Sequence, residues 1–257
     1  MPPENPEIDR IWRSARPRAA LIQGRADWYR IQAKAGEDLA EIYIYDEIGY
    51  FGVTASDFVR DLRNVTQSTI TLHLNTPGGE VFDGIAIYNS LKAHKATINV
   101  IVDGLAASIG SVIAMAGDKV SMAPHSKMMI HEAMALAIGN SSDMLKMAER
   151  LDATSQNIAD IYAEKAGGDA SDWRASMKAE TWYTDQEAVS AGLADEISRS
   201  DSENNTLQVF DLSIFRNVPG SAPAEPQVAI TPPAPAPVDG PSLARRELEA
   251  AIASVKL

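Results

Sequence analysis

Hydrophobic and polar residues alternate along two early stretches of the chain, residues 40–49 (AEIYIYDEIG) and 68–75 (STITLHLN). Successive side chains of a β-strand point to opposite faces, so this period of two predicts two half-buried strands. Between them, residues 54–64 (TASDFVRDLRN) space their apolar side chains at helical intervals after a Thr/Ser start. The pattern therefore predicts a strand, a short helix and a second strand.

The second predicted strand runs into a glycine-containing turn, residues 75–80 (NTPGGE), and then into a helix over residues 81–95. The third predicted strand, residues 96–103 (ATINVIVD), repeats this order: it runs into GLAASIG and a helix that ends near Gly117. The succession of strand, Gly-rich turn and helix thus occurs twice, which predicts an α/β domain.

The following segment contains shorter elements. Residues 118–123 (DKVSMA) and 127–133 (KMMIHEA) read as two short strands. Residues 141–168 carry a helical apolar stripe that ends at a glycine pair, so they predict a long helix. Residues 184–197 open with a capping box, Thr184 and Glu187, and predict one more helix, which ends at Gly192.

Composition divides the chain into four parts. Prolines break residues 1–40, which we expect to be an N-terminal extension, and residues 41–199 carry the patterned domain. Prolines then concentrate between Pro219 and Pro241, so residues 200–241 are expected to form a disordered linker. Residues 242–257 (SLARRELEAAIASVKL) could form a short C-terminal helix, which at this length needs a partner to be stable.

Overall composition narrows the function classes. The chain has 257 residues, a net charge of −12, 45% hydrophobic residues and no cysteine. The negative charge disfavours nucleic acid and anionic membranes as partners, and the absent cysteines exclude a thiol nucleophile. With no apolar leader or membrane-length segment in the sequence, we expect a soluble cytoplasmic protein.

Ser108 stands where the third predicted strand turns into a helix, among alanines and glycines. A serine hydroxyl becomes a nucleophile only when a base removes its proton and donors stabilise the substrate's oxyanion. The backbone N–H of Ile109 is one available donor, and the PGG turn offers a second in Gly78 or Gly79. Taken alone, Ser108 would equally fit a helix cap or a small packing residue.

The base at neutral pH is expected to be one of four histidines. His131 is the best placed, because it ends the predicted strand KMMIH. His94 lies at a helix end and His125 follows a proline in a turn, whereas His73 points to the polar face of its strand. Any one of them would more simply be a surface or core residue.

Four segments in order, NTPGGEVFDGIAIYNSLK, DGLAASIGSVIAMAG, MMIHEA and TWYTDQEAVSAGLADEI, closely resemble the ClpP family of Clp-type serine peptidases over residues 40–198. The resemblance implies a ClpP/crotonase-type fold, a spiral of ββα repeats with a protruding helical handle. It also implies peptide-bond hydrolysis without a metal or organic cofactor.

Carried over to this sequence, the family's catalytic positions fall on Ser108 as nucleophile and His131 as base, with oxyanion donors at Gly79 and Ile109. The acid falls on Glu180, where bacterial members carry aspartate, so Asp185 is kept as an alternative acid. The family further suggests a homo-oligomeric ring acting on protein or peptide substrates.

The N-terminal extension and the tail resemble those of the ClpP-related head-maturation proteases of tailed phages. That resemblance implies capsid or scaffold proteins as substrates, in a bacterial host cytoplasm or inside the prohead. Three alternatives stay open: a housekeeping proteolytic subunit that needs an ATPase unfoldase, a crotonase-like acyl-CoA enzyme, and a catalytically silent assembly or scaffold protein. The presence of both serine and histidine argues against the acyl-CoA enzyme.

Overall fold

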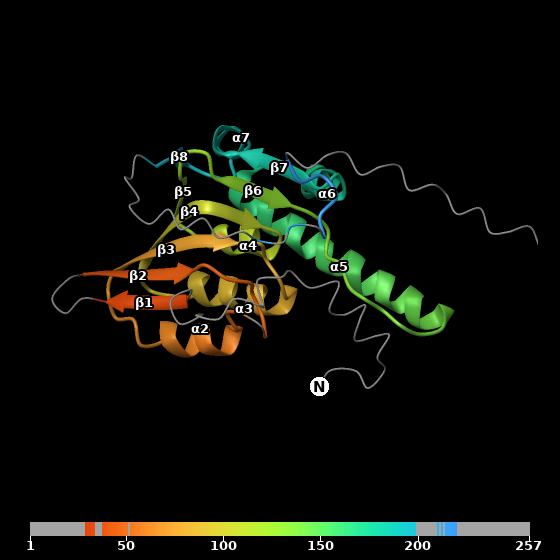
Figure 1. Cartoon of the computed structure of the whole chain (residues 1–257), viewed down its shortest axis with the longest axis horizontal. Coiled ribbons are helices and arrows are strands. Elements are labelled where there is room, and N and C mark those ends of the chain that lie inside the picture. The colour runs from red at the N-terminus through yellow and green to blue at the C-terminus, as the bar shows by residue number, and fades with distance from the viewer. Residues whose placement is uncertain are drawn as a thin grey trace, which may run out of the picture. The chain divides into compact units, whose positions relative to one another are not determined.

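A mixed β-sheet with helices packed on one face forms the framework of the protein (Figure 1). The computed structural model describes residues 29–33, 38–50, 52–198, 210, 212 and 214–219. Over those residues the sheet has eight strands. They are β1 (Tyr29–Ala33), β2 (Leu39–Ile44), β3 (Thr69–Thr76), β4 (Thr97–Ala107), β5 (Lys119–Met122), β6 (Lys127–Ile130), β7 (Thr181–Thr184) and β8 (Glu196–Ile197).

The sheet branches at its longest strand, β4. The strands follow the order β1-β2-β3-β4-β5-β8, in which β1 is antiparallel to β2 and the other neighbours are parallel. The first part of β4 pairs with β5, whereas Leu105–Ala107 pair with β6, which in turn pairs with β7. The carboxyl end of β4 therefore lies between the end of β3 and the end of β6.

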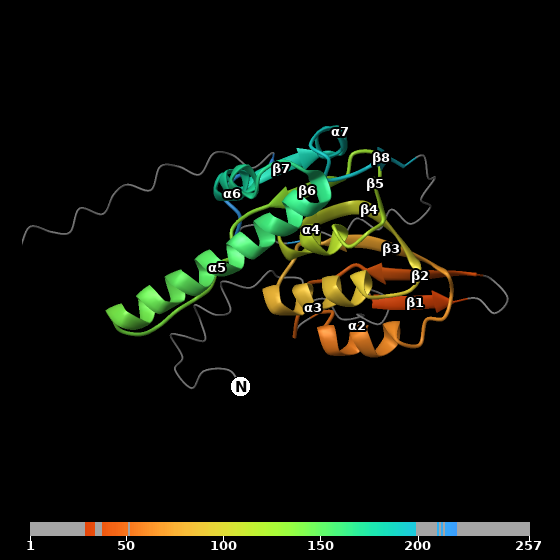
Figure 2. The same cartoon turned by 180° about the vertical axis from the view of Figure 1, so that it is seen from behind.

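Six helices are described: α2 (Ala55–Leu62), α3 (Val81–Lys92), α4 (Ile109–Ala114), α5 (Ser141–Ala166), α6 (Ala170–Lys178) and α7 (Asp185–Ser190). The apolar sides of α2, α3, α4 and the second half of α5 share one hydrophobic core with the sheet. The first half of α5 extends away from the sheet, as the views from front and back both show (Figures 1 and 2). Its Leu145 is 68% exposed, so the apolar stripe predicted for this helix is buried only in its second half.

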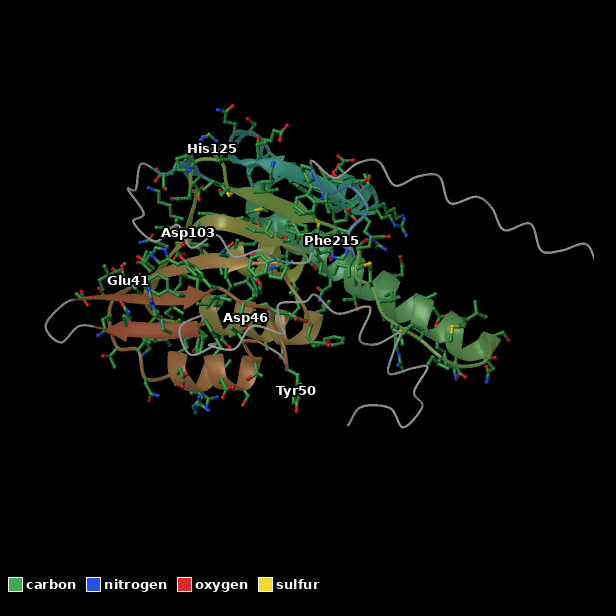
Figure 3. All side chains as sticks on the ribbon, viewed as in Figure 1. Glu41, Asp46, Tyr50, Asp103, His125 and Phe215 are labelled. Atoms are coloured by element: carbon green, nitrogen blue, oxygen red, sulfur yellow. The ribbon has the colours of Figure 1, made fainter. Side chains whose placement is uncertain are left out.

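The alternation along β2 sorts its side chains between two environments. The isoleucines are fully buried in the core, whereas Tyr43 and Tyr45 meet polar partners on the other face of the sheet. There the ring of Tyr43 stacks on that of His73, and Asp103 accepts hydrogen bonds from the Tyr45 hydroxyl at 2.7 Å and pairs with His73 at 2.8 Å. Figure 3 labels Asp103 on this part of the sheet. His73 is thus a partner of a structural carboxylate.

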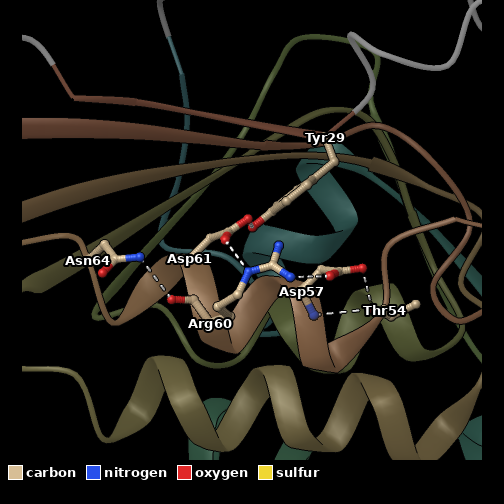
Figure 4. Close-up of polar contacts among 6 residues, drawn as sticks. All are labelled: Tyr29, Thr54, Asp57, Arg60, Asp61 and Asn64. Carbon is tan, nitrogen blue, oxygen red and sulfur yellow. Dashed lines mark hydrogen bonds and ion pairs between the residues drawn. The ribbon is translucent and has the colours of Figure 1, made fainter.

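Strand β1 pairs with β2 over five residues, and its first residue also contacts α2. The Tyr29 hydroxyl donates to Asp61 at 3.3 Å (Figure 4). The Tyr29 ring packs on Phe58, which is fully buried. Helix α2 is capped at its N-terminus by Thr54, whose hydroxyl accepts the Asp57 N–H, as the Ser/Thr start predicts. Residues 29–33 and 39–40, which we placed in an N-terminal extension, therefore belong to the sheet; residues 1–28 lie outside the described residues.

The α/β architecture and the order of elements from residue 40 to residue 168 are confirmed. The predicted capping box at Thr184 and Glu187 is present at the start of α7. The third predicted strand is longer than expected, because β4 continues through the glycine and alanines up to Ala107. The predicted linker over residues 200–241 was wrong in part, since residues 214–219 pack on the domain. Residues 200–209, 211, 213 and 220–241, and the predicted C-terminal helix over 242–257, lie outside the described residues.

Candidate active site

Ser108 forms the whole of the corner between β4 and α4. It is the one residue between the last residue of the strand and the first of the helix, and its φ of 55° and ψ of −128° lie outside the helical and extended regions. A non-glycine residue in such a conformation costs about 1–3 kcal/mol, which the surrounding structure must supply. The Ser108 N–H donates to the Met129 carbonyl at 2.9 Å, which fixes the corner against β6.

His131 lies beside Ser108. Its Nε2 is 2.6 Å from the Ser108 Oγ, although 23 positions separate the two residues in sequence. The topology explains this contact: Ala107 is paired with Met129, so each residue follows the end of one of two neighbouring parallel strands. The structure therefore brings together the two residues that sequence analysis singled out as nucleophile and base.

The PGG turn lies directly against this corner. A Cβ placed on Gly78 would stand 2.8 Å from the Ala107 carbonyl oxygen and 3.2 Å from the Ile109 nitrogen. The Gly78 N–H is already used, because it donates to the Thr76 hydroxyl at 3.1 Å. The N–H groups of Gly79 and Ile109 find no hydrogen-bond acceptor in the described part of the chain. Of the two glycines, Gly79 is thus the one with a donor to offer a substrate.

Burial is the main influence on the charge state of His131. It lowers the pKa of the imidazole from its usual value near 6.5, because a partly desolvated ring disfavours the charged form. The negative charges of Glu180 and, to a smaller extent, Glu132 act in the opposite direction. The lowered pKa leaves His131 neutral, and able to accept a proton, at neutral pH.

Glu180 lies between α6 and β7, where its φ of 51° turns the chain. Its carboxylate accepts the N–H groups of Arg216 at 2.9 Å and Asn217 at 2.6 Å. Among the described residues it makes no hydrogen bond to His131, so its influence on the imidazole acts through charge at longer range.

Asp185, the alternative acid, lies at the first residue of α7. Its carboxylate accepts the backbone N–H of His125 at 3.0 Å and the N–H of Gln186. No contact with His131 is formed, and Asp185 is absent from the charges that influence that imidazole. Of the two candidate acids, the structure brings only Glu180 into electrostatic range of His131.

The remaining histidines stand apart from Ser108. His94 accepts the Ala96 N–H near the end of α3, and His125 is exposed in a turn with a positive φ of 67°. In the part of the chain that the structure describes, no three His, Asp or Glu side chains group together as metal ligands would. No described helix combines the length and apolarity needed to cross a membrane.

A pocket of about 180 Å³ opens beside Ser108 and His131. One wall is formed by the PGG turn and by apolar side chains of α4 and α5. Another wall is formed by Ile214 and Phe215. Sequence analysis missed these last two residues, because they stand just before the proline-rich stretch, in a segment with no periodic pattern. Figure 3 labels Phe215 on the ribbon.

Comparison with known proteins gives an independent view of the chain. The sequence profile of the family described as "Clp protease" matches residues 33–201. An "ATP-dependent Clp protease proteolytic subunit" from Deinococcus radiodurans is 34% identical over 154 residues, which cover 59% of this chain and 75% of that protein. A protein of the same name from Streptococcus pneumoniae is 37% identical over 139 residues, which cover 52% of this chain and 71% of the relative.

Proposed function

Since the chain belongs to the Clp protease family, a family of peptidases, we propose that it is a serine endopeptidase with Ser108 as nucleophile and His131 as general base. The observation that carries this proposal is the 2.6 Å contact between the His131 Nε2 and the Ser108 Oγ. A neutral imidazole at this distance accepts the hydroxyl proton as the oxygen attacks a carbonyl carbon.

The proposed reaction follows from the groups around that contact. Ser108 Oγ bonds to the scissile carbonyl carbon, its proton passes to His131 Nε2, and the carbonyl oxygen gains the negative charge. The N–H groups of Gly79 and Ile109 donate to that oxygen. His131 then gives the proton to the leaving amine, and a water activated by the same imidazole hydrolyses the acyl-enzyme.

For the acid we propose Glu180. Its two hydrogen bonds to backbone N–H groups hold a negative charge in place, and that charge stabilises the imidazolium formed when His131 takes the proton. Asp185 is engaged at the start of α7 and lacks this electrostatic link to His131.

For the fold of the chain we propose the family's spiral of ββα repeats. For the assembly we propose rings of this chain, which associate through the exposed first half of α5 as the handle. Leu145, at 68% exposed, and Met144, at 37%, would be covered in such a ring.

For the substrates we propose capsid or scaffold proteins processed during phage head maturation, a proposal that rests on the sequence before residue 40 and after residue 199.

A second biological setting is favoured by a specific observation, the name of the relatives. Both are ATP-dependent proteolytic subunits, so this chain would act with an ATPase that unfolds its substrates. The two settings differ in one measurable way: cleavage of a folded protein substrate without an unfoldase supports head maturation, and cleavage only with an ATPase and ATP supports the second setting.

The test of the catalytic proposal uses a fluorophosphonate, which phosphonylates only activated serines: the serine Oγ bonds to phosphorus and fluoride leaves. Peptide mapping of the full chain should show one adduct, on Ser108. In His131→Ala the labelling rate should fall by about 10³-fold or more, because the base is lost. His94 accepts the Ala96 N–H and makes no contact with Ser108, so His94→Ala should label like the wild type. An unlabelled Ser108, or full labelling of His131→Ala, would refute the assignment.

A further inference from the structure

The segment of residues 214–219 contacts both His131 and Glu180. The ring of Phe215 meets the His131 ring nearly at right angles, with centroids 5.4 Å apart. The next two residues, Arg216 and Asn217, give their N–H groups to the Glu180 carboxylate. Three consecutive residues thus touch the proposed base and the proposed acid.

This segment is anchored to the domain by packing. Phe215 is only 6% exposed and joins a small apolar cluster with Leu105, Ala107 and Met129. Trp182 on β7 adds a second ring contact, at 6.0 Å and 77°. Ala107 is the last residue of β4 and Met129 is the last but one of β6, so Phe215 packs on the two strand ends that Ser108 and His131 follow.

A polar contact fixes the other end of the segment. The Asn217 side-chain amide donates to the Ala179 carbonyl at 2.8 Å, one residue before Glu180. The segment is therefore tied to the chain on which Glu180 lies as well as to Glu180 itself, and the carboxylate is held by charge-assisted hydrogen bonds.

The segment leaves the reactive groups open. With Phe215 in place the Ser108–His131 contact is intact, and the N–H groups of Gly79 and Ile109 have no acceptor in the described part of the chain. The segment forms a wall of the 180 Å³ pocket and does not fill it. These features are those of a supporting element, since an inhibitory segment would cover the nucleophile or occupy its oxyanion donors.

We propose that residues 214–219 complete the active site in cis, with Phe215 as a positioning residue for the His131 ring and the Arg216 and Asn217 N–H groups as the holders of Glu180. This inference rests on the proposed serine-peptidase function. It assigns a catalytic purpose to a segment outside residues 33–201, the region matched by the family.

The test compares fluorophosphonate labelling rates of the full-length wild type and Phe215→Ala. Removing the ring frees the imidazole to take other orientations, and small misplacements of a catalytic group cost up to about 100-fold, so we expect a fall of about 10-fold to 100-fold. Phe215→Leu, which keeps most of the apolar volume, should recover part of the loss. Leu212→Ala removes packing from the same cluster without a contact to His131, and should label at the wild-type rate.

The pH profile separates positioning from mere folding. Phe215→Ala exposes His131 to water, which weakens the burial that lowers its pKa. The acid limb, the pH range in which labelling rises as His131 loses its proton, should therefore move to higher pH. Leu212→Ala should leave it in place. The charged groups around His131 are Glu180 and Glu132, the latter paired with Arg174, and none of them is altered in either variant. Circular dichroism of each variant checks that the fold is retained.

The contribution of the Asn217 N–H is tested by Asn217→Pro, which lacks it, beside Asn217→Ala, which keeps it and loses only the side-chain anchor. We expect a larger loss of labelling in the proline variant. The inference would be overturned if wild type and Phe215→Ala label equally with an unmoved acid limb, or if Phe215→Ala or Asn217→Pro labels faster than wild type. In either case the wild-type adduct on Ser108 would still support the serine-peptidase proposal. A wild type that is not labelled on Ser108 would overturn both.

Discussion

Gly78 lies so close to Ser108 that a Cβ added to the glycine would stand 2.6 Å from the Cβ of the serine. Atoms of this kind do not approach within 3.0 Å, so the turn after β3 can reach the corner after β4 only because one of the two residues has no side chain. Gly78 also has a φ of +95°, a conformation that L-residues avoid. The proximity of the two strand ends thus depends on this glycine.

Gly78→Ala is therefore expected to do two separate things. The positive φ should lower the free energy of unfolding by about 1–2 kcal/mol, and the clash should displace Ser108 and abolish most of its labelling. Gly167→Ala is a matched control, because Gly167 has a similar φ of +80° and nothing within 4 Å of an added Cβ. Denaturant unfolding should show a loss in both variants, larger in Gly78→Ala because the clash adds to the strain, and fluorophosphonate labelling should fail only in Gly78→Ala. Equal labelling of both would contradict the close packing described here.

The identity of the acid gives a second prediction. Glu180→Gln removes the charge that supports the imidazolium, so the rate of peptide cleavage should fall by about tenfold or more. Asp185→Asn changes a carboxylate that only binds the His125 and Gln186 N–H groups, and cleavage should stay within about twofold of wild type. Steady-state kinetics on one peptide substrate compares the two. A strong loss in Asp185→Asn with normal cleavage by Glu180→Gln would transfer the role to Asp185.

The parts of the molecule that could be predicted are those whose pattern is local. The strands around Ile42 and Leu72 alternate because one face is buried, and α7 begins with a capping box that the sequence spells out. Helix α6 was missed because it buries only Met177 over its nine residues, which leaves almost no apolar stripe. Strand β1 was missed because it is only five residues long, and what holds it, pairing with β2 and contacts of Tyr29 with Phe58 and Asp61, lies further along the chain.

The same distinction applies to the site. Ser108 and His131 were found because each follows a recognisable strand, and motifs identify them. The contribution of residues 214–219 was hidden, because Phe215 is buried by residues on β4, β6 and β7 and the Glu180 partners are backbone N–H groups. Backbone donors have no sequence signature, so only the fold reveals them.

The pH dependence of the reaction follows from the burial of His131. Because its pKa lies below 6.5, the neutral base persists into mildly acidic solution, and labelling should rise with pH to a half-maximum below pH 6.5 and then level off. Glu132→Gln removes a charge that raises this pKa, so its half-maximum should lie at a still lower pH. Rates measured from pH 4.5 to 8 with the same fluorophosphonate test both statements. A wild-type midpoint above 6.5, or a shift of Glu132→Gln to higher pH, would be incompatible with this account.

The buried pair of Ser111 and Tyr162 links α4, the helix that follows the nucleophile, to α5. The Ser111 hydroxyl donates its one proton to the Ser108 carbonyl at 2.6 Å, so across the 2.8 Å contact between the two hydroxyls Tyr162 is the donor. Ser111→Ala leaves both the Ser108 carbonyl and the Tyr162 hydroxyl without this partner in a buried site, and should lower the free energy of unfolding by about 1–3 kcal/mol.

Tyr162→Phe removes only the donor, so its loss should be smaller. The double variant Ser111→Ala/Tyr162→Phe should lose less than the sum of the two, because the tyrosine hydroxyl left unpaired by the serine change is then absent, with a coupling of about 0.5–3 kcal/mol. Urea unfolding of the four proteins measures it. Ser190→Ala, an exposed helical serine that also donates to a carbonyl, should change stability by less than about 0.5 kcal/mol. Strictly additive losses would mean that the two hydroxyls do not interact in solution.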